Sequence, residues 1–189
     1  AVKLGWNSIC YLGHGKTPKM KDIEVFKGHE CTCETTSDVT RFSHESNDIS
    51  IARTTTDEAT RKAFETPGID IVIPESGRID HVMASLGRKN GISLCFDFRK
   101  LLQSWGMDRS AVFSAYKESA RIVKKYGTPF VLSSCAVTWQ DIRAPNELMT
   151  LATSLGLDRK KAAESMSGHM ITRRSKPDRL QKGVELSPL

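Results

Sequence analysis

Short apolar runs alternate with amphipathic stretches along most of this sequence. Each apolar run spans a few residues, which is typical of strands covered on both faces. The amphipathic stretches place an apolar residue at every third or fourth position, as helices do. Strands are predicted at residues 8–12, 23–26, 49–52, 69–73, 92–96 and 130–132, and helices at 57–64, 80–89, 110–126, 147–155 and 160–166. This alternation predicts a parallel sheet in an α/β fold.

Residues 124–136 give the clearest example of the pattern. Gly127 suits the left-handed position that ends a helix. The apolar run 130–132 then predicts a buried strand, and Ser133 and Ser134 follow where that strand leaves the core. Ligands bind at the carboxyl ends of strands in parallel α/β folds, so this exit is a candidate functional face.

An open doubly wound sheet and a closed barrel both fit this pattern. A full eight-stranded barrel would be small, because about 250 residues are typical and the chain has 189. One α/β domain is expected over residues 1–175, followed by a basic tail at 176–189 that frays. Asp57 is the expected cap of the helix it precedes. Residues 28–47 are polar and irregular, and a loop or two weak strands are expected there.

Composition favours a cytoplasmic protein. The 39% of hydrophobic residues can form a core, and no run approaches the roughly 20 apolar residues that span a bilayer. The first residues lack the apolar core of a signal peptide. The odd number of cysteines, five, fits reduced thiols better than a disulfide framework.

The charge is positive and uneven. The net charge is +6, and residues 151–189 hold eight Lys and Arg against four Asp and Glu, so +4 of the +6 lies there. Such a bias favours a polyanionic partner, most often nucleic acid, although a solvated basic surface gives the same count.

Three motifs that could carry chemistry lack the required spacing. His29, Glu30, Cys31 and Cys33 offer four metal-binding side chains, but no distant second pair completes a zinc site, and a polar strand edge is expected instead. Ser134 is not part of a Gly-x-Ser-x-Gly turn. The Gly-Lys-Thr at residues 15–17 lacks the earlier glycine of a phosphate-binding loop. No catalytic residue and no metal ligand is therefore predicted.

Cations and hydroxyls stand at the predicted strand exits and helix starts. Arginine contacts phosphate well but rarely hydrolyses it unaided. For any one of these residues taken alone, a structural ion pair or plain solvent exposure is the more common explanation, and their shared side of the fold is what favours a joint role. The predicted RNA-binding residues are Arg53, Arg78, His81, Arg99, Lys100, Ser134, Arg143, Arg173 and Arg174.

These blocks resemble a known family, the 30-kilodalton protein subunit of ribonuclease P, called component 3 in archaea. The strongest similarity is residues 120–134, with Ala120, Arg121, Val123, Lys125, Tyr126, Gly127, Pro129, Val131, Ser133 and Ser134. The blocks 142–148 and 155–157 follow in the family's order. Upstream, residues 3–9, 79–84 and 90–92 resemble its first turn and its middle.

The resemblance implies a compact TIM-barrel-like fold related to the polymerase-and-histidinol-phosphatase fold. It implies a subunit of an endoribonuclease that removes 5′ leaders from precursor tRNA. The catalytic group there is an RNA with bound Mg²⁺, so this chain would bind no cofactor itself. The implied partners are the ribonuclease P RNA, precursor tRNA and a ferredoxin-like component 2 in a two-plus-two heterotetramer, in the cytoplasm, or in the nucleus if the source is eukaryotic.

The sequence departs from the family's pattern at its start. The strand and most of the helix that precede residues 4–6 in the family are absent from this sequence. The related phosphatases carry a His-x-His metal pair on that strand, and no such pair is present. The alternative hypothesis is a metal-dependent phosphoesterase that uses His14, His29, Glu30 and His81.

Overall fold

A computed structural model of the chain describes residues 1–13, 18–44 and 49–174, with side chains described up to residue 166. Within these ranges six strands form one parallel sheet in the order β1-β2-β3-β4-β5-β6. The strands are β1 (Ser8–Tyr11), β2 (Glu24–Cys33), β3 (Ile49–Thr54), β4 (Ile71–Pro74), β5 (Ser93–Asp97) and β6 (Phe130–Ser133).

The strand order distinguishes a barrel-like sheet from a doubly wound one. Spatial order follows chain order throughout, so the sheet has no point at which its direction reverses. In the described residues β1 pairs only with β2, and β6 only with β5, so the sheet stays open as a half-barrel. The TIM-barrel-like prediction is thereby confirmed.

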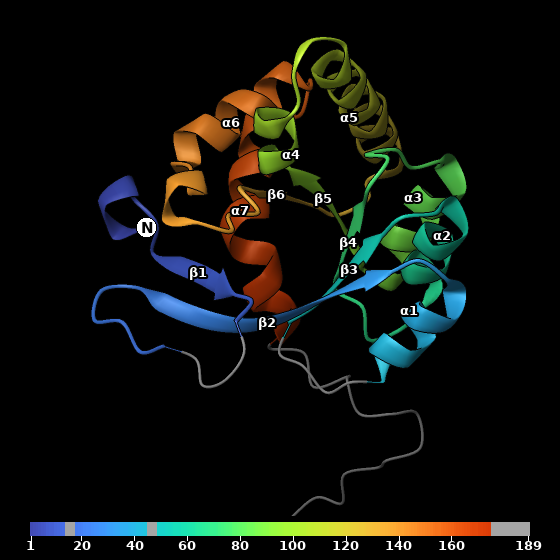
Figure 1. Cartoon of the computed structure of the whole chain (residues 1–189), viewed down its shortest axis with the longest axis horizontal. Coiled ribbons are helices and arrows are strands. Elements are labelled where there is room, and N and C mark those ends of the chain that lie inside the picture. The colour runs from blue at the N-terminus through green and yellow to red at the C-terminus, as the bar shows by residue number, and fades with distance from the viewer. Residues whose placement is uncertain (14–17, 45–48, 175–189) are drawn as a thin grey trace, which may run out of the picture.

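From β2 onward, one or two α-helices follow each strand. They are α1 (Thr36–Ser43), α2 (Asp57–Glu65), α3 (His81–Asn90), α4 (Phe98–Gln103), α5 (Gly106–Tyr126), α6 (Pro145–Ser154) and α7 (Arg159–Arg174), with short 3₁₀ turns η1 (Val2–Leu4) and η2 (Trp139–Asp141). Helices α1, α2, α3 and α5 pack side by side along the outer face of the sheet (Figure 1). In the described residues no helix is long and apolar enough to cross a membrane.

The core has two layers separated by the sheet. The outer layer lies between the sheet and the helices, where Phe96 meets Tyr116 and Phe130 edge to face, with ring centroids 5.6 and 6.2 Å away. A fully buried aromatic side chain of this kind contributes about 1.5–3 kcal/mol. The inner layer, on the concave face, consists of Ile49, Ile51, Ile71, Ile73, Cys95 and Val131.

Several local predictions were wrong in the least apolar stretches. Residues 28–33 continue β2, and 36–43 form α1, in place of the expected loop or weak strands. Thr56, not Asp57, caps α2, because its side chain accepts the amide of Ala59. The last predicted helix continues from 166 to Arg174. The expected tail at 176–189 lies outside the described residues.

Candidate functional site

The carboxyl ends of the strands, with the loop or helix start that follows each, form one edge of the half-barrel, here called the rim. Most of the predicted residues lie on it: Arg53 in β3, Arg78 just before α3, His81 as the first residue of α3, Arg99 and Lys100 in the first turn of α4, Ser134 directly after β6 and Arg143 just before α6. The prediction of a shared side of the fold is confirmed for these seven residues.

Arg53 lies at the mouth of the half-barrel between two carboxylates. Its Nε donates to Glu30 Oε1 at 2.6 Å, and its Nη1 donates to Asp97 Oδ2 at 3.2 Å. Burial alone would lower the pKa of Arg53, but the hydrogen bond and charge of Glu30 and the charge of Asp97 outweigh it and raise that pKa. The guanidinium is therefore a fixed cation that joins β2, β3 and β5.

Asp97 is the residue that organises this mouth, and the strand-exit reasoning missed it. Its side chain is only 8% exposed, and its second oxygen accepts the amide of Lys100 at 3.1 Å, which caps α4. Its backbone carbonyl accepts the hydroxyl of Tyr116 at 3.0 Å. Burial, followed by the charge of Asp97, raises the pKa of Tyr116. A carboxylate that ends an apolar strand run was the signal available in the sequence.

The segment between β6 and α6 is anchored to the rest of the rim. Cys135 adopts a left-handed backbone, with φ 44°, immediately after Ser134. Asp141 then accepts the amides of Val137 and Thr138 at 3.2 and 2.9 Å, and Arg99 Nε lies 3.7 Å from the same carboxylate. The Arg99–Asp141 ion pair therefore joins α4 to η2.

Arg143 also has a structural role. Its Nη1 donates to the carbonyl of Gln140 at 2.8 Å, and its own carbonyl accepts the indole N–H of Trp6 at 2.8 Å. These bonds tie the start of α6 to the N-terminal segment. The side chain is half-buried, so part of the guanidinium still faces solvent.

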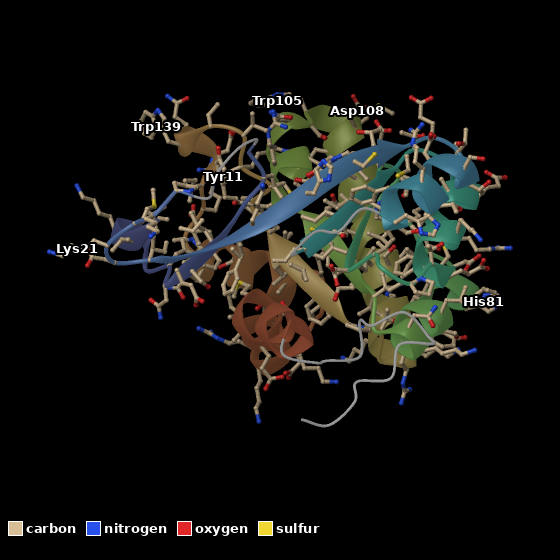
Figure 2. All side chains as sticks on the ribbon, turned by 90° about the horizontal axis from the view of Figure 1, so that it is seen from below. Tyr11, Lys21, His81, Trp105, Asp108 and Trp139 are labelled. Atoms are coloured by element: carbon tan, nitrogen blue, oxygen red, sulfur yellow. The ribbon has the colours of Figure 1, made fainter. Side chains whose placement is uncertain are left out.

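The other rim cations are more accessible. Arg78 is 64% exposed and makes one long ion pair, 3.9 Å from Glu118. His81 is exposed on the outer side of the molecule (Figure 2). Lys100 is half-buried, and its ammonium donates to the carbonyl of Glu75. The structure thus separates the rim cations into those held by carboxylates or backbone carbonyls, and those open to solvent, Arg78 and His81.

Arg173 and Arg174 do not lie at a strand exit or at a helix start. They are the last two residues of α7, since that helix runs beyond the predicted 160–166. Their side chains lie outside the described residues.

The candidate metal ligands of β2 are split between the two faces of the sheet. The ring of His29 packs on Phe42 of α1 with centroids 5.4 Å apart, and Cys33 lies in the outer core. Burial raises the pKa of the Cys33 thiol to about 12, and the neighbouring Cys31 adds to the effect. Glu30 points to the other face, where it pairs with Arg53. Among the described residues no group of three such side chains is placed to hold an ion.

This geometry also fails to bring together the ligands of the alternative phosphoesterase. His29 and Glu30 face opposite sides of β2, and His81 lies on α3. His14 lies outside the described residues. The structure gives this alternative no observation in its favour.

An exposed apolar patch lies beyond the rim and was not predicted. Trp105 and Met107 at the start of α5, and Val137 and Trp139 near η2, are exposed apolar side chains on these two segments, and the four are together called the tryptophan patch. The two indoles are 76% and 81% exposed, and both project along the same edge of the molecule (Figure 2). The Arg99–Asp141 ion pair connects the two segments that carry them.

Together, the strand order and the open half-barrel define a protein of the α/β-barrel class. The mouth, where such folds place their catalytic groups, holds a cation neutralised by two carboxylates. The RNase P subunit p30 family model matches residues 13–176, and the chain belongs to that family of ribonuclease P protein subunits.

Curated relatives extend over most of the chain. The chain is 30% identical to the ribonuclease P protein component 3 of Methanosarcina mazei, over 87% of this chain and 75% of that protein. It is 28% identical to the same component of Methanosarcina barkeri, over 98% of this chain and 86% of that protein.

Solved structures agree on the fold. A chain in the cryo-EM structure of archaeal ribonuclease P with mature tRNA matches with a TM-score of 0.79 and 21% identity, over 100% of this chain and 92% of that one. A crystal structure of an uncharacterised protein matches with a TM-score of 0.58 and 12% identity, over 91% of this chain and 56% of that one.

Proposed function

We propose that this chain is the component 3 subunit of ribonuclease P, and that it binds and stabilises the catalytic RNA for removal of the 5′ leader from precursor tRNA. The family match over residues 13–176 is the observation that carries the proposal. The Mg²⁺ that supports the chemistry would belong to the RNA. The cytoplasm is the proposed location, in keeping with the free thiols of all five cysteines.

The rim residues predicted from the sequence remain the proposed RNA contacts. Arg78 is the strongest of them, because its single ion pair is long and exposed, and such pairs contribute little. Arg53 and Arg99 would have to exchange carboxylate contacts for phosphate contacts, which makes them weaker candidates. Partly or fully accessible side chains on the same rim are also proposed contacts: His81, Lys100, Ser134 and Arg143. The same proposal includes Arg173 and Arg174 at the end of α7.

Replacement of Arg78 by alanine tests the rim. We expect Arg78→Ala to weaken binding of the reconstituted protein subunits to the ribonuclease P RNA by about three- to tenfold and to reduce the salt dependence by about one phosphate contact. The measurements are the dissociation constant for that RNA at several salt concentrations and the rate of cleavage of a 5′-extended precursor tRNA by the reconstituted complex. Arg41→Ala is a matched control, because Arg41 is also exposed and also in a single surface ion pair, with Asp38 on α1. Equal results for both variants and the wild type would show that Arg78 is not an RNA contact. A complex that cleaves precursor tRNA equally well without this chain would refute the proposed function.

The tryptophan patch is the proposed docking surface for a ferredoxin-like component 2, in an assembly of two plus two chains. Tryptophan, methionine and arginine are enriched in protein interfaces, and tryptophans often dominate their binding energy. Trp105 and Trp139 meet this description, since they are apolar, prominent and held on anchored segments.

Alanine at either tryptophan should therefore weaken component 2 binding by about 30-fold, the loss expected at an interface hot spot. The measurement is the dissociation constant between this chain and component 2, together with the mass of the complex. Met20→Ala is the control, because Met20 is 55% exposed and belongs to the β1–β2 connection, not to either segment that carries the patch. Unchanged protein binding with weakened RNA binding would show that the patch stacks on RNA bases instead.

A further inference from the structure

A second group of cations lies at the opposite end of the helices from the rim. Helices α3 and α5 pack against each other, and both end at a left-handed glycine, Gly91 with φ 66° and Gly127 with φ 68°. Five cations lie at or near these two ends and are here called the basal cluster: Arg88 and Lys89 on α3, and Arg121, Lys124 and Lys125 on α5. All five side chains are exposed.

Few acidic side chains lie near the basal cluster in the sequence of its own helices. The nearest is Glu118 of α5, three residues before Arg121, and its carboxylate lies 3.9 Å from Arg78. Residues 82–91 and 119–127 contain these five cations and no Asp or Glu. In the part of the chain that the structure describes, none of the five forms an ion pair, whereas Arg53, Arg78 and Arg99 of the rim all do. The adjacent end of α2 adds one exposed carboxylate, Glu65, so positive charge remains in clear excess.

The positions of the five cations give the cluster a defined shape. Arg88 Nη1 donates to the carbonyl of Tyr126 at 3.0 Å, which fastens the end of α3 to the end of α5. Lys125 Nζ lies 5.5 Å from the ring centroid of Tyr126. Arg121, Lys124 and Lys125 are three and four residues apart, so they share one face of α5 over about 6 Å of its axis.

Stabilisation of the helix ends explains only part of this arrangement. Cations in a last helical turn interact favourably with the helix dipole, but the effect fades beyond that turn. Arg88 has this role directly, through its bond to the Tyr126 carbonyl. Arg121 lies five residues before the end of α5, outside the last turn, and Lys89, Lys124 and Lys125 leave their ammonium groups free for an external anion.

We infer that the basal cluster is a second RNA-binding surface, which holds backbone phosphates of a folded segment of the ribonuclease P RNA. The inference rests on the proposed function, since that function supplies the RNA. Exposed lysines and arginines without carboxylate partners suit backbone phosphates, which need charge and hydrogen-bond donors but no base-specific pocket. The chain would then contact RNA at both ends of its helices and hold two RNA segments at a fixed separation.

A pair of matched triple variants tests this inference. The basal variant replaces Lys89, Lys124 and Lys125 by glutamine, and leaves Arg88 in place because it joins the two helices. The control variant replaces Lys3, Lys19 and Lys21, three exposed lysines near β1, by glutamine. Both variants lower the net charge by the same amount, so a general electrostatic effect would be equal in the two.

The measurement is binding of the holoenzyme proteins to cognate ribonuclease P RNA over a range of salt concentrations. We expect the basal variant to bind about 10- to 100-fold more weakly and its log–log salt slope to be shallower by about 2, with less than a threefold change in the control. Lysine acetylation with and without the RNA gives a second readout, in which RNA should protect Lys124 and Lys125 but not Lys19 or Lys21.

The possible outcomes separate the two proposals. Equal losses in both variants, or a lowered melting temperature of the basal variant with unchanged RNA affinity, would overturn the basal site and leave the proposed function standing. A wild-type chain that neither binds the RNA nor supports cleavage would overturn both.

Discussion

The mouth side of the rim and the basal cluster hold similar cations in opposite states, whereas Arg78 and His81 of the rim are exposed like the basal cations. At the rim, Arg53 and Arg99 are neutralised by carboxylates from other elements, and Arg143 is bound to a backbone carbonyl. In the basal cluster, Lys89 and Lys124 face solvent without a carboxylate partner in the described residues. A count of positive charges along the chain does not show this difference. The availability of a cation for RNA depends on which carboxylates the fold brings to it.

The physical reason for the difference is burial. The side chains of Arg53 and Arg99 are only 28% and 33% exposed, so an unpaired charge there would be costly. The basal cations lie on the outer ends of two helices, where water solvates them and no partner is needed. Fixed cations therefore stabilise the half-barrel, and solvated ones remain free for an external polyanion.

Removal of Asp97 should give the largest effect and the clearest contrast between the two ends. Asp97→Ala leaves the half-buried Arg53 with one carboxylate and removes the cap of α4, so the free energy of unfolding should fall by about 3 kcal/mol. Lys124→Ala in the basal cluster should change it by less than about 0.5 kcal/mol. Urea unfolding of the two variants measures both values.

Asp97→Asn is the informative companion variant, because it keeps the shape and the cap acceptor but loses the charge. Its free energy of unfolding should lie between that of the wild type and that of Asp97→Ala. A loss below about 1 kcal/mol for Asp97→Ala, or an equal loss for Lys124→Ala, would contradict the assignment of the rim as the structural end.

Most of the sheet could be predicted from the sequence, because its strands are apolar on both faces. The run 130–132 and the glycine after α5 are examples in which local composition alone determines the structure. Helix α1 was missed because it buries only Val39 and Phe42 among polar residues. The capping box between Thr35 and Asp38 was the one local sign that a helix begins there. A search for apolar periodicity does not detect such a polar signal.

The arrangement of the rim could be predicted only in part. The carboxyl-end rule correctly placed Arg53 and Arg99 on one edge. The partners of Arg53 lie 23 and 44 residues away, and only the strand register brings them together. The basal cluster was missed for a related reason: Lys124 and Lys125 were interpreted as a helix end, and Arg88 and Lys89 become their neighbours only when α3 and α5 pack.

Acidification should produce the smallest effect, and it should appear at the rim alone. The backbone amide of Thr138 is the main cause that lowers the pKa of Asp141 below its ordinary 3.8, and the Thr138 hydroxyl, the Val137 amide and the charge of Arg99 act in the same direction. Because the pKa is lowered in the folded state, the ionised carboxylate holds the loop fully above pH 3.8 and releases it as the pH falls through the lower folded value. The backbone amide shifts of Val137 and Thr138, followed by NMR, should therefore titrate with a midpoint below 3.8, and Asp141→Asn should abolish that transition.

The amides of Gly91 and Gly127 at the basal end are the control, and they should show no matching step. A midpoint at or above 3.8 for the two rim amides would mean that these hydrogen bonds do not hold the carboxylate in its charged form.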